Sequence, residues 1–150
     1  MKIYEARTAP NPRRVRIFLA EKNIPMDYVQ IALQKGENMS AEFRKKNTWA
    51  KVPVLELDDG TCISETVAIC RYFEEIQPEP SLMGRDALER ANIEMWQRRM
   101  EFSLLVPTGM CFQHTSGYFA DRMTPNKEWG EDCAKQVKKM VKLGQHPVMT

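Results

Sequence analysis

The stretch Lys51–Glu75, KVPVLELDDGTCISETVAICRYFEE, decides the fold of this chain. A largely apolar run follows Pro53 and ends at the dipeptide Asp59-Gly60. Asp-Gly favours a two-residue hairpin turn because both residues tolerate positive φ. The stretch therefore predicts an antiparallel hairpin with strands over Pro53–Leu57 and Thr61–Ile63.

A helix is predicted directly after this hairpin. Ser64 stands where an N-cap is expected, and Glu65 places a negative charge in the first turn. Apolar side chains then recur at helical spacing, at Ala68, Ile69, Tyr72, Phe73 and Ile76. One stripe of this helix is therefore expected to be buried.

The two ends of the predicted unit offer backbone groups to a ligand. Pro53 has no N–H and cannot donate to a neighbouring strand, so the peptide groups of Val52 beside it are left for an extended ligand. The first N–H groups of the helix, at Glu65, Thr66 and Val67, have no partner within it and suit a carboxylate. One end could hold a peptide backbone, and the other its acid group.

The motif Lys51-Val52-Pro53, followed by Ser64-Glu65-Thr66-Val67-Ala68-Ile69, resembles the glutathione transferase family. The resemblance implies a cis Val52–Pro53 bond, with the Val52 backbone paired to the cysteinyl part of glutathione. It implies that Glu65-Thr66 binds the γ-glutamyl group; Thr66 keeps the hydroxyl where the family more often has Ser. It also makes Asn38 and Lys51 candidates for the glycyl carboxylate, although each could equally be a solvated surface residue.

Family members stabilise the glutathione thiolate from the start of the first helix. The position that carries Ser in several classes falls on Ala9 here, and its neighbour is Thr8. Asn11 matches the Pro-Asn of a bacterial subgroup, and its amide can donate to a thiolate without titrating. We therefore take Asn11 as the first candidate catalytic residue and Thr8 as the second. The alternatives are a simple N-cap for Asn11 and a loop hydroxyl for Thr8.

The chain before this motif predicts a βαβ unit. A strand over Lys2–Glu5 leads to a helix over Pro12–Lys22, with Asn11 as its N-cap, and Tyr28–Leu33 forms a second strand. A short helix follows at Ser40–Lys46. With the hairpin and its helix, the order is β-α-β-α-β-β-α, the thioredoxin-like order, over residues 1–78. Arg13 and Arg14 of the first helix could tune the thiolate charge or pair with the second domain, although most such arginines form exposed salt bridges.

The rest of the chain, residues 79–150, is predicted to be a proline-rich linker and a helical region. Asp86 and Glu89 form a capping-box pattern at the start of a long helix, which Pro107 should bend or end. A further helix is expected to start at Thr124-Pro125 and to stop near Gly144. The fold class is thus α/β plus all-α. Family members continue through several more helices, so we expect an incomplete, shortened helical domain.

Composition excludes several other classes of protein. The chain has 43% hydrophobic and 28% charged residues, and 22 Lys and Arg against 20 Asp and Glu, so neither nucleic acid nor an anionic membrane is an expected partner. The N-terminus has no signal-peptide core, which predicts a cytoplasmic protein. Four cysteines and two histidines without paired spacing predict no metal site.

The predicted function is glutathione transfer to small electrophiles, as in detoxification, or glutathione-dependent reduction of disulfide-type substrates, by a homodimer. Glutathione is then the cosubstrate. The alternative is a non-catalytic binding or interaction protein on the same fold. Dithiol exchange is disfavoured, because Thr8–Pro12 contains no cysteine. His114 lies in a region that lines the electrophile pocket in relatives, and otherwise reads as a satisfied helix histidine.

Overall fold

The computed structural model describes residues 1–144 and divides the chain into two compact units, Met1–Met83 and the residues from Gly84 onward. Residues 145–150 lie outside the described part. Within residues 1–144, none of the helices is both long and apolar enough to span a bilayer.

The first unit is built on a four-stranded sheet of order β2-β1-β3-β4. Its strands are β1 (Lys2–Glu5), β2 (Asp27–Gln30), β3 (Val54–Glu56) and β4 (Cys62–Ser64). β1 pairs with β2 in parallel and with β3 antiparallel, and β3 pairs with β4 antiparallel. The predicted hairpin is confirmed. The predicted second strand is too long, because Leu33–Lys35 form the 3-10 turn η1 instead.

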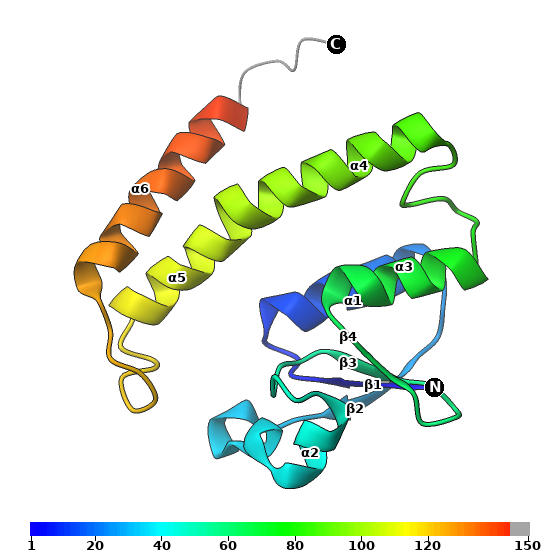
Figure 1. Ribbon diagram of the computed structural model, residues 1–150, viewed down its shortest axis with the longest axis horizontal. Helices are drawn as coiled ribbons and strands as arrows, with labels where there is room; N and C mark the ends of the chain where they lie inside the picture. Colours follow the sequence, from blue (N-terminus) through cyan, green and yellow to red (C-terminus); the bar gives the residue numbers. More distant parts are fainter. Residues whose placement is uncertain (145–150) are drawn as a thin grey trace. The chain divides into compact units, whose positions relative to one another are not determined.

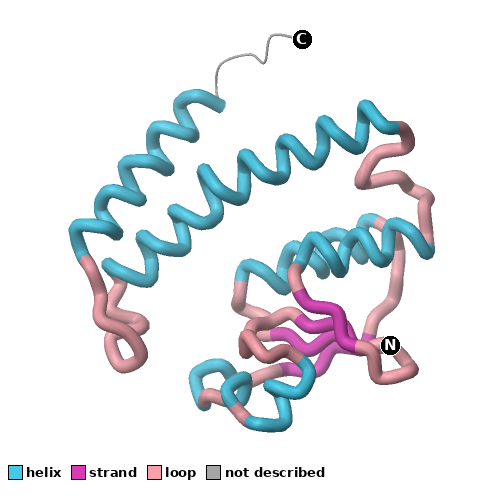
Figure 2. Tube along the Cα trace, in the orientation of Figure 1, coloured by secondary structure: helices cyan, strands magenta, loops and turns pink. Residues whose placement is uncertain are grey.

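Two helices, α1 (Pro10–Glu21) and α3 (Thr66–Ile76), lie side by side on one face of this sheet (Figures 1 and 2). Alternate strand residues point to this face, and Ile3 pairs with Leu55 in the register. Together they form the larger core, made of Ile3, Val15, Leu19, Leu55, Ile69, Cys70, Phe73 and Met83. The apolar stripe predicted for α3 is thus confirmed.

The opposite face of the sheet is covered by α2 (Ala41–Lys46), which the 3-10 turn η2 (Glu37–Met39) precedes. The Ser40 side chain caps this helix by accepting from the N–H of Phe43. Phe43 packs in a second buried cluster with Ala6, Ile31, Val52 and Val54. The element order and the two covered faces confirm the predicted thioredoxin-like fold.

Both helices that border the candidate site begin elsewhere than predicted. α1 begins at Pro10 after the cap residue Ala9, so Asn11 is its second residue and not its N-cap. Ser64 is the last residue of β4, and the cap position of α3 is Glu65, with φ 69° and no side-chain cap. Proline at the first position of a helix costs no hydrogen bond, which explains the earlier start of α1.

A buried ion pair closes the end of the first unit. The fully buried Lys22 ammonium lies 2.8 Å from Glu74 Oε2 and donates to the carbonyls of Gln77 and Pro80 at 2.6 and 2.8 Å. Glu74 Oε1 accepts from the N–H groups of Leu82 and Met83 at 2.9 Å. Burial disfavours the charged Glu74 carboxylate and so acts to raise its pKa. The hydrogen bonds outweigh this effect and hold the pKa below the usual value. Segment 77–83 is therefore fixed to α1 and α3.

The second unit is helical, as predicted. It contains α4 (Ala87–Met100), the π-helical segment η3 (Glu101–Leu105), α5 (Val106–Thr115) and α6 (Lys127–Gly144), and α5 packs against α6. Asp86 caps α4 by accepting from the N–H of Glu89 at 2.9 Å, so the predicted capping pair is confirmed.

Two details of the predicted second unit differ. Pro107 was predicted to bend or end the long helix, and it does not end it, because the wider π turn of η3, one residue before it, replaces the regular bond that a proline cannot make. The sixth helix starts later than Thr124-Pro125. Asn126 acts as its cap, since Asn126 Oδ1 accepts from the N–H of Trp129 at 3.0 Å.

Candidate active site

The strand directions bring three segments of the first unit to one edge of the sheet. Residues 6–9 follow β1, residues 52–53 precede the antiparallel β3, and residues 65–66 follow β4, which runs in the direction of β1. The carboxyl end of β1, the amino end of β3 and the carboxyl end of β4 therefore lie together (Figure 1). All the candidates on these three segments share this edge.

The Val52–Pro53 segment has the form that the resemblance implies. Its peptide bond is cis. Neither the N–H nor the carbonyl of Val52 has a hydrogen-bond partner within residues 1–144, although the Val52 side chain is only 9% exposed. An extended peptide could therefore pair with this backbone, as the sequence predicts.

Two amide side chains form hydrogen bonds to the backbone just before this segment. Asn38 Nδ2 donates to the carbonyl of Ala50 at 2.8 Å, and the buried Asn47 donates from Nδ2 to the carbonyl of Lys51 at 2.9 Å. One of the two Asn38 amide hydrogens is thus used within the protein, so Asn38 supports the backbone beside Lys51 through Ala50. Lys51 is exposed, and the structure describes no ion pair for it in residues 1–144. Its ammonium is open to an anion.

The start of α3 presents a hydroxyl and free N–H groups at the same edge. Thr66 is 9% exposed, and its Oγ1 accepts from Arg14 Nη1 at 2.9 Å. Because the oxygen accepts from Arg14, the hydroxyl hydrogen remains free to be donated to a ligand. Glu65 is exposed beside it and holds a positive φ, a backbone conformation that non-glycine residues adopt mainly where the surroundings enforce it.

Arg14 is a candidate whose partner, Thr66, sequence reasoning missed. It is half-buried and bonded to Thr66, and not an exposed salt-bridge partner. The two residues are 52 positions apart, so no local pattern could have paired them. Asn47 was missed for the same reason: its role depends on the turn that follows α2.

The start of α1 offers few donors, and Asn11 supplies most of them. Pro10 and Pro12 have no N–H, so the Asn11 N–H is the free backbone donor of the first turn. The side chains of Asn11 and Thr8 are exposed, without a hydrogen-bond partner in the described part of the chain. The positive end of a 12-residue helix and these donors suit a thiolate.

Three of the protein's four thiols are poor nucleophiles by comparison. Burial raises the pKa of Cys70 to about 11, and burial also raises the pKa values of Cys62 and Cys133. At neutral pH these sulfurs are therefore protonated. The described residues contain no group of three or more His, Cys, Asp or Glu side chains that could hold a metal ion.

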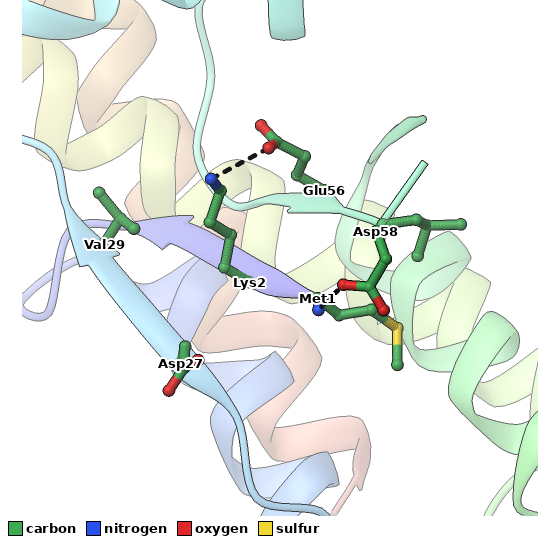
Figure 3. A pocket seen from close by; sticks show the side chains of 7 residues that line it. Met1, Lys2, Asp27, Val29, Glu56 and Asp58 are labelled. Carbon is green, nitrogen blue, oxygen red and sulfur yellow. Dashed lines mark hydrogen bonds and ion pairs between the residues drawn. The ribbon is translucent and has the colours of Figure 1, made fainter. Parts of the chain in front are cut away.

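The opposite end of the sheet carries a hollow of about 330 Å³ (Figure 3). There Lys2 Nζ lies 3.1 Å from Glu56 Oε1. The lining residues are Met1, Lys2, Asp27, Val29, Glu56, Leu57 and Asp58. None of the candidate residues lines this hollow, so it is separate from the site at the other edge.

His114 belongs to the second unit. Its Nδ1 accepts from the N–H of Asn126 at 3.0 Å, which joins α5 to the residue that caps α6. This bond agrees with the interpretation of His114 as a satisfied helix histidine.

Comparisons with known proteins agree with this fold. A family model described as glutathione S-transferase, N-terminal domain, matches residues 8–76. Glutathione S-transferase 2 of Saccharomyces cerevisiae is 45% identical over 134 residues, which cover 87% of this chain and 58% of that protein. The chain thus spans little more than half the length of this curated relative.

Solved structures extend the comparison to the helical unit. The crystal structure of Gtt2 from Saccharomyces cerevisiae aligns with a TM-score of 0.89 at 39% identity, covering 95% of this chain and 71% of that one. A glutathione S-transferase domain-containing protein from Marinobacter aquaeolei VT8 aligns with a TM-score of 0.90 at 37% identity and covers 95% and 72%. A chain so similar over so much of a solved relative shares its family, and this chain therefore belongs to the glutathione S-transferase family.

Proposed function

We propose that this chain is a glutathione transferase that binds glutathione at the edge formed by residues 6–9, 52–53 and 65–66. One observation carries the proposal. In a member of this family, an unpaired Val52 backbone, a Thr66 hydroxyl free to donate and the start of α1 all lie at the same sheet edge. These are the groups that a short acidic peptide with a thiol requires.

Each part of glutathione has a partner in this arrangement. The cysteinyl backbone pairs with Val52, next to Pro53. The γ-glutamyl carboxylate accepts from Thr66 and from the first N–H groups of α3, and Glu65 pairs with the γ-glutamyl ammonium. Lys51 attracts the glycyl carboxylate, and Asn38 supports it through Ala50.

The chemistry is that of an activated thiol. Donors from Asn11 and Thr8, with the positive end of α1, stabilise the thiolate, so the thiol releases its proton to solvent more readily. The sulfur then forms a bond to an electrophilic carbon, and the displaced group leaves with its electron pair. With a disulfide substrate, the thiolate attacks one sulfur and the other leaves as a thiolate.

The remaining features of the whole protein are part of the same proposal. The protein is a cytoplasmic homodimer with a role in detoxification. Its domains are those predicted from the sequence, residues 1–78 and residues 79–150, a linker with a partial helical domain; bonds from residues 80–83 to Lys22 and Glu74 attach the start of this linker to the first domain. The apolar side chains exposed on the described helices of the second unit, such as Leu88 and Phe102, favour association.

Isothermal titration with reduced glutathione tests the proposal. We expect Glu65→Ala to weaken binding about tenfold or more, because a hydrogen-bonded pair with a charged group contributes about 1.5–3 kcal/mol. Glu75→Ala is the matched control, since Glu75 is also an exposed glutamate of α3. Binding with turnover of an electrophile or a disulfide supports the enzyme, and binding without turnover supports the non-catalytic alternative. A folded wild-type chain that does not bind glutathione would refute the proposal.

A further inference from the structure

The loop between β1 and α1 is a single tight turn that carries Thr8 and leads to Asn11. The N–H of Ala9 donates to the carbonyl of Ala6 at 2.9 Å and closes the turn. Arg7 and Thr8 are its central residues. The direction of the Thr8 hydroxyl and the position of the first turn of α1 therefore depend on the peptide groups of Arg7.

Both peptide groups of Arg7 form hydrogen bonds with side chains and not with the backbone of a neighbouring strand. Its N–H donates to Gln30 Oε1 at 3.1 Å, and its carbonyl accepts from Arg16 Nη2 at 2.9 Å. Gln30 is the last residue of β2, and Arg16 lies about two turns into α1. A turn on the surface is thus tied to two different elements.

Both of these side chains meet at one buried carboxylate. Gln30 Nε2 donates to Glu5 Oε1 at 2.7 Å, and Arg16 Nη1 forms an ion pair with Glu5 Oε2. Glu5 is only 2% exposed. A buried ion pair contributes little net stability, because desolvation offsets the attraction, so stability alone does not explain this cluster.

We propose that Glu5, Arg16 and Gln30 are positioning residues, which hold the turn at residues 6–9 so that Thr8 and the first turn of α1 face the sulfur of bound glutathione. The proposal rests on the glutathione transferase function proposed above. None of the three touches the substrate. They act through the backbone of Arg7, and small displacements of a group next to a reacting atom reduce rates strongly.

Two mild substitutions test this proposal in the full chain. Arg16→Lys keeps a cation beside Glu5 but cannot also reach the carbonyl of Arg7. Gln30→Ala removes the other bond to Arg7 at a position that is exposed in the fold. Arg44→Lys is the control, because Arg44 also donates to a backbone carbonyl, that of Met39 at 3.3 Å, away from this turn.

The readouts are the melting temperature, the affinity for glutathione, and the pH dependence of both kcat and the ultraviolet absorbance of the bound thiolate. For Arg16→Lys and Gln30→Ala we expect glutathione affinity within about threefold of wild type and kcat about tenfold lower near neutral pH. The pKa of the bound thiol should rise by about one unit, and kcat should recover at higher pH.

A purely structural role for the cluster would lower the melting temperature and leave the pH profile in place. Profiles of both variants that superimpose on those of wild type and Arg44→Lys would overturn the proposal while leaving the transferase function intact. A wild-type chain that neither binds nor turns over glutathione would instead overturn both.

Discussion

The Thr66 hydroxyl is the polar group whose surroundings say most about ligand binding. Arg14 occupies its oxygen, so its hydrogen is available to an anion. Thr66→Val keeps the side-chain shape and removes the donor, so we expect glutathione to bind about tenfold more weakly. Thr66→Ser keeps the donor, and its affinity for glutathione should stay within about threefold of wild type. Titration calorimetry compares the variants. Equal affinity for Thr66→Val and wild type would contradict the role given to this hydroxyl.

The Glu56 carboxylate gives a pH-dependent prediction at the other end of the sheet. The hydrogen bond from Lys46, with those from Lys2 and Tyr4, lowers its pKa from 4.5 to about 2. A carboxyl whose pKa falls on folding stabilises the folded state above its unfolded pKa, and this contribution is lost as pH falls from 4.5 towards 2.

Glu56→Gln removes this titration. We expect the variant to be less stable than wild type at neutral pH, and the difference should shrink as pH falls through that window. Urea unfolding at several pH values measures it, with Glu42→Gln on the exposed surface of α2 as the control. A gap between wild type and Glu56→Gln that stays constant from pH 7 to below pH 3 would contradict the prediction.

Some residues of the site could be predicted from the sequence, and others could not. Val52 and Thr66 are marked by neighbours in the chain: a following proline, and the start of a helix after a hairpin. Arg14 was named from the sequence, but only the contact across the fold identifies Thr66 as its partner. The Asn38 amide was predicted as a ligand contact; one of its two hydrogens is donated to the carbonyl of Ala50, a contact with the turn after α2 that no sequence pattern indicates.

The helices were predicted more reliably than their first residues. Apolar periodicity identified α1 and α3, and this signal comes from the buried face along the whole helix. The first residue of each helix depends instead on which of several alternative local hydrogen bonds forms. At α3 the strand pairing of Ser64 with Val54 took precedence over its use as an N-cap. At α1 the helix continues back through Asn11 to Pro10, which needs no N–H partner there.

The packing of α5 against α6 makes a prediction about two glycines. A Cβ added at Gly130 would lie 2.6 Å from Thr115 Cγ2 and 2.9 Å from His114 Cβ, whereas one at Gly109 meets nothing within 4 Å. We expect Gly130→Ala to lower the free energy of unfolding by about 1–2 kcal/mol, because overpacking outweighs the gain in helix propensity.

Gly109→Ala is the matched control, and we expect it to raise the free energy of unfolding by up to about 1 kcal/mol. Thermal and urea unfolding, followed by circular dichroism, measure both variants. The packing argument fails if Gly130→Ala is as stable as Gly109→Ala.

At the scale of the whole molecule, the order of elements followed from the sequence, but the end of the first unit did not. The prolines after Gln77 indicate a linker, and the sequence therefore places the boundary at residue 78. In the structure, contacts divide the chain after Met83. This end depends on the buried Lys22, directly after α1, and lysine is rarely buried, so no sequence rule would have predicted it.

Two fragments of the chain test where the first folding unit ends. A fragment of residues 1–78 lacks the N–H groups of Leu82 and Met83 that donate to Glu74, and the carbonyl of Pro80 that accepts from Lys22. It also lacks the Met83 side chain, which is 3% exposed in the core. A fragment of residues 1–84 keeps all of these, and we expect it to be more stable by about 3 kcal/mol or more.

Urea unfolding of the two fragments, followed by circular dichroism, measures this difference. The variant Met83→Ala in the longer fragment separates the two contributions, because it removes the buried side chain and keeps the backbone bonds to Glu74. It should lose about 2–3 kcal/mol. A remaining advantage over the shorter fragment would then be due to the partners of the buried ion pair. Equal unfolding midpoints for both fragments would instead place the end of the first folding unit at residue 78, where the proline pattern alone predicts it.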